Sequence, residues 1–215
     1  CKLEGVKYIL DDKCVVFENT KEHFLAIANM LIDSDKHSVF EWKCIVDFDL
    51  KEEDEHSANG KESKKEKDAK QRKRKPADID IDREPKELTN AICMGFVAHP
   101  LDESVESLYS KLGATGTQYG FCVSHNSREA HAYFSRNSAI HHTCAVKLSE
   151  RVSSGDEFKI ICNMKRGKCD IYHNEHLIMD VFNSKIPDKI IPAVSGFIHH
   201  GNASCTIELV PSSLT

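Results

Sequence analysis

The stretch GDEFKIICNMKRGKCDIYHNEHLIMDVFNSKIPDKIIPAVSGF, residues 155–197, contains the clearest structural pattern of the chain. Two runs in it, FKIIC at 158–162 and CDIY at 169–172, are rich in β-branched and apolar residues, which favours strands. Gly167 lies in the polar corner between them, and glycine supplies the positive φ that a hairpin turn needs. Asn174 tolerates the same conformation, so a third strand is predicted to fold back after it. The pattern predicts an antiparallel three-stranded meander.

The stretch ends in Pro-Ala-Val-Ser at 192–195, where proline indicates a strand start or an edge strand, because it has no N–H to donate. The order of motifs resembles the C-terminal half of a SPRY domain, a family that typically shows G-D, a glycine turn, F-Y-x-N-G, a phenylalanine and then Y-P-A-V-S. The matching residues are Gly155-Asp156, Gly167, Ile171-Tyr172, Asn174, Phe182 and Pro192-Ala193-Val194-Ser195. Glu175 stands where the family has the turn glycine. A β meander outside this family is the alternative.

The resemblance extends over nearly the whole chain apart from a charged insert after residue 50. Residues 39–50 form the longest strand pattern, and the segment around Trp42, the only tryptophan, resembles the family's Y-W-E-V-x-V strand. Residues 89–98 resemble its G-V/F-A strand, and residues 119–123 resemble its S-W-G-Y strand. The resemblance implies an all-β fold, an antiparallel two-sheet β-sandwich of SPRY or concanavalin A-like type, formed as a single domain by residues 1–215.

Local patterns predict the remaining elements. Residues 14–17 are a strand candidate after the Asp11-Asp12 turn, and residues 130–134 are expected to continue the sheet. Residues 141–147 lead into Gly155, and alternation of apolar and polar residues indicates a last strand at 203–210. Residues 21–32 place apolar side chains at helical spacing, so a short helix or a loop is expected there.

Residues 51–75 have a different character, with ten basic and seven acidic side chains and no aromatic residue. Such a segment cannot bury enough apolar surface to offset its ordering entropy, so residues 51–88 are predicted to be a disordered charged insert. We expect it to join two neighbouring strands as a long hairpin connection. A possible import signal within it comprises Lys70, Arg72, Lys73, Arg74 and Lys75. A charge-balanced, solvated loop is the alternative.

Composition limits the function classes. The net charge of −5 argues against a chain that binds nucleic acid or a membrane through its whole surface. No apolar run approaches the ~18 residues of a membrane span. Because the chain begins at Cys1, we expect it to be part of something longer.

The nine cysteines include no C-x-x-C pair, and several lie among apolar residues of predicted strands. There, free cysteine behaves as a small buried hydrophobe. The expectation is a set of reduced thiols in an intracellular protein, cytoplasmic or nuclear. Disulfide pairing is the alternative.

Twelve histidines invite a metal hypothesis, but neighbouring residues on a strand point to opposite faces, so adjacent histidines cannot chelate one ion from a regular strand. No metal and no cofactor are expected. Glu41, Asp47 and Asp49 share one face of a predicted strand and could mimic the carboxylates of a glycosidase. The chain has no nucleophile elbow and no phosphate-binding loop, so it is not expected to be an enzyme.

The SPRY resemblance implies protein recognition through loops at one end of the sandwich. Positions of the family's peptide-binding pocket match His23, Phe24, Tyr109, His199 and His200. Histidines stand where relatives carry an aromatic residue after P-A-V-S, so binding is expected to weaken on protonation near about pH 6. The predicted partner is a protein surface or short peptide, recognised on behalf of a larger protein such as a ubiquitin ligase, a chromatin complex or a signalling scaffold. A lectin-like carbohydrate-binding sandwich is the alternative, followed by a glycosidase.

Overall fold

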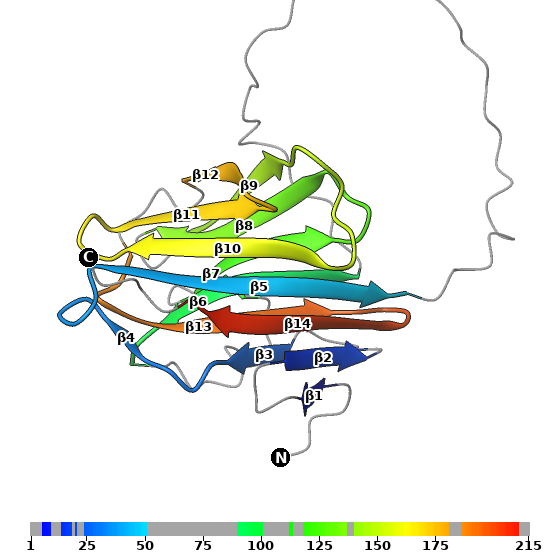
Figure 1. Cartoon of the computed structure of the whole chain (residues 1–215), viewed down its shortest axis with the longest axis horizontal. Coiled ribbons are helices and arrows are strands. Elements are labelled where there is room, and N and C mark those ends of the chain that lie inside the picture. The colour runs from blue at the N-terminus through cyan, green and yellow to red at the C-terminus, as the bar shows by residue number, and fades with distance from the viewer. Residues whose placement is uncertain are drawn as a thin grey trace, which may run out of the picture.

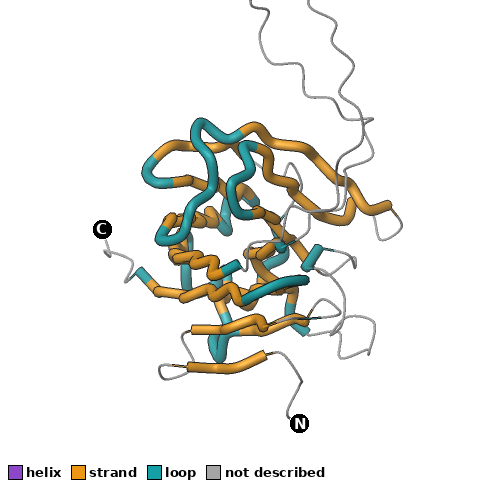
Figure 2. The backbone as a smooth tube through the Cα atoms, turned by 90° about the vertical axis from the view of Figure 1, so that its right-hand side faces the viewer, coloured by secondary structure: helices purple, strands orange, loops and turns teal. Residues whose placement is uncertain are grey.

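The structure is a computed structural model, and it describes residues 6–9, 14–18, 20, 24–50, 90–100, 112–113, 118–136, 140–180 and 186–210. These residues form fourteen strands and no helix, arranged as two antiparallel sheets (Figures 1 and 2). The described residues contain no helix that is long and apolar enough to cross a membrane. The prediction of an all-β, two-sheet sandwich is confirmed.

The first sheet has seven strands. In spatial order they are β1 (Val6–Ile9), β2 (Cys14–Glu18), β14 (Asn202–Leu209), β5 (Val39–Asp49), β10 (Asp156–Asn163), β11 (Lys168–His173) and β12 (His176–Asp180). The second sheet runs in the order β3 (Phe24–Ile27), β13 (Lys189–Phe197), β6 (Ala91–Ala98), β7 (Gln118–Ser124), β8 (Glu129–Arg136) and β9 (Ile140–Lys147), with β4 (Ile32–Asp33) also paired to β13.

The core lies between the two sheets, and β5 shows how the sequence builds it. Its even-numbered residues from Phe40 to Val46 are buried, while the odd-numbered residues face outward. Trp42 is fully buried and meets Phe96 of the opposite sheet edge to face, with ring centroids 6.3 Å apart. Period-two alternation along this strand thus places one row of side chains in the core between the sheets.

The predicted meander is present as β10, β11 and β12. Gly167 has a φ of 62° in the first turn, as expected for a glycine corner. In the second turn Asn174 and Glu175 have φ values of 45° and 72°, the pattern of a two-residue hairpin turn with both central residues left-handed. Glu175 therefore adopts a left-handed conformation, which glycine adopts most readily, and its carboxylate lies 3.5 Å from Lys159 Nζ.

Pro192 departs from its prediction. It lies inside β13, between β6 and the short strands β3 and β4, so it does not mark a strand start. Its carbonyl oxygen accepts a hydrogen bond from Ala28 N. The carbonyl of Pro192, and the side of its backbone where other residues carry an N–H, therefore face β3 and β4 and not β6. There the pairing ends at Ile27 and resumes at Ile32, so no ladder bond requires the N–H that proline lacks.

The helix or loop expected at residues 21–32 is present only as the loop of residues 28–31, and the strands on either side of that loop correct the prediction. Residues 24–27 form β3, which pairs with β13, and residues 32–33 form β4. Ala26 is buried toward the main core and Leu25 toward the outer face, so the segment alternates as a strand. Pairing with a distant strand outweighs the local helical spacing.

The charged insert was expected to join two neighbouring strands, and the structure corrects this prediction. β5 belongs to the first sheet, where it pairs with β10 and β14, whereas β6 belongs to the second. Residues 51–89, including the proposed import signal, therefore connect the two sheets. They lie outside the described residues.

The expectation of reduced cysteines fails for one pair. Cys93 and Cys122 are direct cross-strand partners on β6 and β7, and they form a disulfide. They are 29 residues apart in the sequence, so no local motif could reveal the pairing. The five other cysteines whose thiols are described, Cys14, Cys44, Cys162, Cys169 and Cys205, are buried without a disulfide, as predicted.

Candidate partner-binding end

One end of the sandwich brings together segments that are far apart in the sequence. β13 passes to β14 there through residues 198–201, which we call the histidine turn. The turn lies beside the end of β5 (Figure 1), because Asn202 pairs with Asp49. β6 begins at the same end, since Ala91 pairs with Phe197.

Two side chains fix the backbone of the histidine turn. Thr20 Oγ1 accepts a hydrogen bond from Ile198 N at 2.7 Å. Asn90 Oδ1 accepts bonds from His199 N at 2.7 Å and from His200 N at 3.3 Å. Asn90 has a φ of 53°, a left-handed conformation that asparagine adopts more readily than most residues. The turn is therefore held by residues from two other loops.

The turn presents a row of rings at the surface. His199 and His200 are exposed, and their ring centroids are 5.0 Å apart. Phe197, which is half-buried, meets His199 edge to face at 5.7 Å. Such rings offer apolar contact area together with polar nitrogen atoms, a combination that is suited to binding a peptide or protein surface.

The remaining predicted partner-binding residues are only partly placed. Phe24 begins β3 and pairs in register with Gly196, so its backbone lies near the histidine turn, but its side chain is outside the described residues. His23 and Tyr109 also lie outside them. Tyr109 belongs to the connection from β6 to β7, which leaves β6 after Ala98, at the opposite end of the sheet from the histidine turn.

Sequence reasoning missed the two residues that hold the turn. Asn90 stands just before a predicted strand, a position that indicates a turn but not its distant partner. Thr20 and Ile198 are 178 residues apart, so no spacing in the sequence relates them.

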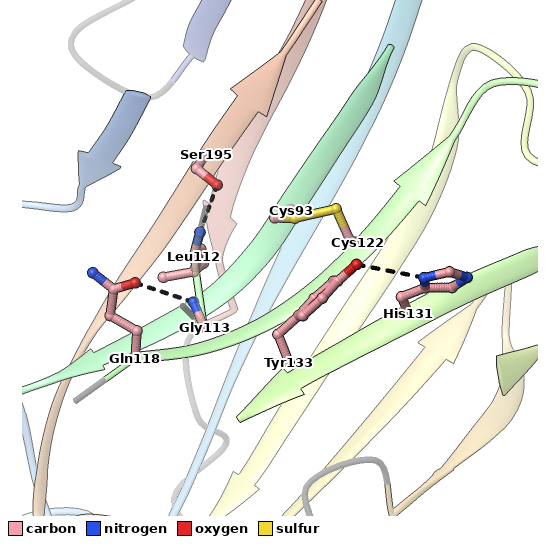
Figure 3. The surroundings of a disulfide bond; sticks show 8 residues. All are labelled: Cys93, Leu112, Gly113, Gln118, Cys122, His131, Tyr133 and Ser195. Carbon is pink, nitrogen blue, oxygen red and sulfur yellow. Dashed lines mark hydrogen bonds between the residues drawn. A yellow bond between two sulfur atoms is a disulfide. The ribbon is translucent and has the colours of Figure 1, made fainter. Parts of the chain in front are cut away.

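The connection from β6 to β7 returns at Leu112 and Gly113, which we call the Leu112 segment, and packs on the outer face of the second sheet (Figure 3). Leu112 N donates to Ser195 Oγ at 3.0 Å, and Gly113 N donates to Gln118 Oε1 at 3.1 Å.

The Leu112 side chain is fully buried in an apolar cluster on that outer face. The members of the cluster are Leu25, Ala91, Cys93, Val97, Leu112, Cys122 and Ala193. Gly120 makes room for the segment, because a Cβ there would lie 2.0 Å from the Leu112 carbonyl oxygen. This part of the outer face is closed to a ligand.

The carboxylates of the glycosidase alternative lie on the outer face of the first sheet. Asp47 and Asp49 are exposed and Glu41 is half-buried. Six residues of strand place Glu41 about 20 Å from Asp47 along β5, well beyond the ~5–10 Å that separates the two carboxyl groups of glycosidases. Only Asp47 and Asp49 are close enough to act together, so the three do not form one catalytic group.

Asp156 organises a partly buried polar cluster at the start of β10. Its carboxylate lies 2.7 Å from His173 Nε2 and accepts hydrogen bonds from Ser153 N at 2.8 Å and Asn174 Nδ2 at 2.9 Å. The His173 ring stacks on Phe158 at 4.5 Å. Burial raises the pKa of the Asp156 carboxyl, but these hydrogen bonds outweigh it, and the pKa lies below its usual value.

No group of three or more potential metal ligands is present in the described ranges of the chain. The expectation that no metal is bound stays a prediction for the chain as a whole.

No protein-family model matches this chain, and no curated protein matches it in sequence. Among solved structures it is similar to the TRIM65 PSpry domain, with a TM-score of 0.53 at 8% identity over 97% of this chain and 84% of that one. The human HERC1 SPRY domain aligns with a TM-score of 0.47 at 10% identity over 99% and 98% of the two chains. A carbohydrate-binding module, CBM66 from Bacillus subtilis, aligns with a TM-score of 0.47 at 7% identity over 95% and 88%. The chain therefore has the β-sandwich fold of SPRY domains.

Proposed function

We propose that this chain is a non-catalytic recognition domain that binds a peptide segment or protein surface at the end that carries the histidine turn. The observation that supports this most strongly is that Thr20 and Asn90 hold the backbone of the turn while His199 and His200 remain exposed. A surface that is ordered before binding loses less conformational entropy when a partner arrives. The fold supports the same proposal, since the SPRY resemblance implies partner recognition through loops.

The test begins with a peptide library displayed on phage and selected on the purified chain. Affinities of the selected peptides are then measured for the parent chain and for a His199→Ala, His200→Ala double variant. We expect the double variant to bind about tenfold or more weakly, the loss typical of removing central interface side chains. Its urea unfolding midpoint should match that of the parent, because both side chains are exposed.

The matched control is His99→Ala. His99 is also exposed, but it follows the opposite end of β6, so this variant should bind as the parent does. The proposal is wrong if the double variant keeps full affinity, or if free sugars release the selected peptides. The second outcome would favour the carbohydrate-binding alternative instead.

A further inference from the structure

Six of the seven cysteines whose thiols are described lie close to another cysteine across neighbouring strands. Cys93 and Cys122 are already joined. Cys162 of β10 and Cys169 of β11 are direct register partners, and their Sγ atoms are 3.3 Å apart. Cys44 of β5 and Cys205 of β14 form the third pair, and a hydrogen bond with Cys44 together with burial raises the pKa of the Cys205 thiol.

The second and third pairs differ in register. Cys162 faces Cys169 directly, whereas Cys44 faces Ile207 and Cys205 faces Val46, so the third pair is diagonal. Side chains directly opposite on antiparallel strands have Cβ atoms about 4.5–5.5 Å apart, and diagonal neighbours are about 7–8 Å apart. A disulfide needs Cβ atoms at about 3.5–4.5 Å, so the direct pair requires much the smaller adjustment.

We propose that Cys162 and Cys169 are a thiol oxidation site, at which a small disulfide such as oxidised glutathione forms a second cross-strand disulfide. One cysteine thiolate attacks the small disulfide, forms a mixed disulfide and releases one glutathione thiol. The other cysteine thiolate then attacks the protein-bound sulfur and releases the second glutathione thiol. In sum, two protein thiols lose two protons and two electrons, and one glutathione disulfide is reduced to two thiols.

The position of the pair provides a route for the reagent. Both thiols are buried, but they lie next to the turn between β10 and β11, where Lys165 and Arg166 are exposed. Opening the end of this hairpin exposes the two sulfurs without unfolding the sandwich, since hairpin ends open locally at lower cost than a whole domain. The site lies at the far end of β10 from Asp156, so it is separate from the polar cluster there.

Trypsin makes the bond directly observable. Cleavage after Lys159, Lys165 and Lys168 places Cys162 in peptide 160–165 and Cys169 in peptide 169–185. The folded chain is incubated in glutathione buffers of increasing oxidised fraction, quenched with N-ethylmaleimide and digested without reduction. We expect the two peptides to appear joined, with a mass two hydrogen atoms below the sum of the reduced peptides.

The chain offers an internal control. Cys44 and Cys205 fall in peptides 44–51 and 190–215, which should stay unlinked and alkylated throughout. Peptides 87–111 and 112–128 contain Cys93 and Cys122. When these two peptides are joined, they report the Cys93–Cys122 disulfide and show that the buffers are oxidising enough. The proposal is overturned if peptides 160–165 and 169–185 remain alkylated while Cys93 and Cys122 are joined, or if the diagonal pair links equally well.

A second readout separates a bond in the folded chain from one made during unfolding. Oxidation should raise the thermal midpoint of the parent by about 2–4 °C, the shift that about 1 kcal/mol produces in a domain of this size. Cys162→Ala and Cys169→Ala variants should show no such rise. An equal rise in these variants would contradict the assignment.

Discussion

The backbones of the histidine turn and of the Leu112 segment are held by the same kind of hydrogen bond, but their side chains differ in burial. In both, side-chain oxygens accept hydrogen bonds from backbone amides: Thr20 and Asn90 at the turn, Ser195 and Gln118 at the segment. The Leu112 side chain is fully buried, whereas His199 and His200 are exposed. A loop held in this way can either close a surface or present one, and the burial of its side chains distinguishes the two roles.

The largest expected effect follows from this difference. Leu112→Ala removes a fully buried side chain from the cluster on the outer face of the second sheet, so we expect a loss of about 3 kcal/mol of unfolding free energy. Urea unfolding measures it. Leu177→Ala is the control, because Leu177 is 57% exposed and its truncation should change stability by less than about 0.5 kcal/mol. Equal losses would mean that the Leu112 segment does not pack as described.

Gly120→Ala tests the close approach of the same segment. The new Cβ would lie 2.0 Å from the Leu112 carbonyl oxygen, so the segment must shift, at a cost of about 2 kcal/mol. Gly155→Ala has nothing within 4 Å of its new Cβ and a φ of 86°, so it should cost only about 1 kcal/mol of backbone strain. The comparison fails if Gly120→Ala is the milder of the two in thermal unfolding.

The hydrogen bonds that hold the two loops should differ in their contribution to stability. Ser195→Ala leaves the buried Leu112 N–H without its acceptor, so we expect a loss of about 1.5 kcal/mol. Asn90→Gly removes an acceptor from solvent-exposed amides and tolerates the left-handed φ, so it should cost about 0.5 kcal/mol. Chemical denaturation of both variants checks the order, and a reversed order would contradict it.

The smallest expected effect concerns Asp156. Its hydrogen-bond acceptor is a carboxylate, which titrates, whereas the acceptors that hold the histidine turn and the Leu112 segment are hydroxyl and amide oxygens, which do not. Its folded-state pKa is lowered, so its stabilising contribution is complete above the unfolded pKa of about 3.9 and is lost as the pH falls through the folded value. Asp156→Asn should therefore be less stable at neutral pH and lose less stability below about pH 4. Unfolding measured between neutral and acid pH checks this, and parallel pH profiles for variant and parent would contradict it.

Local patterns predicted most strands, because each of β5, β10, β11 and β12 carries its own alternation or turn residue. The errors occurred where pairing with distant residues decides the structure. Residues 24–27 became a strand only because β13 is beside them, and the proline in β13 is accommodated by a gap in the opposing strands. The disulfide likewise depends on register between β6 and β7.

The candidate site shows the same division. The position of His199 and His200 follows from the Pro-Ala-Val-Ser motif that precedes them, and the structure places both at the surface of one end. That Asn90 holds their backbone could not be predicted, because it lies 109 residues before His199. Whether His23, Phe24 and Tyr109 contribute side chains to binding stays a prediction.

The central claim is that an ordered histidine turn forms the binding surface. The most direct measurement is the affinity of one selected peptide for the parent, Asn90→Gly and Asn90→Asp, with unfolding free energies measured in parallel. Asn90→Asp keeps an acceptor oxygen and should bind as the parent does, whereas Asn90→Gly should bind several-fold more weakly with almost unchanged stability. Equal affinity for all three would contradict the claim.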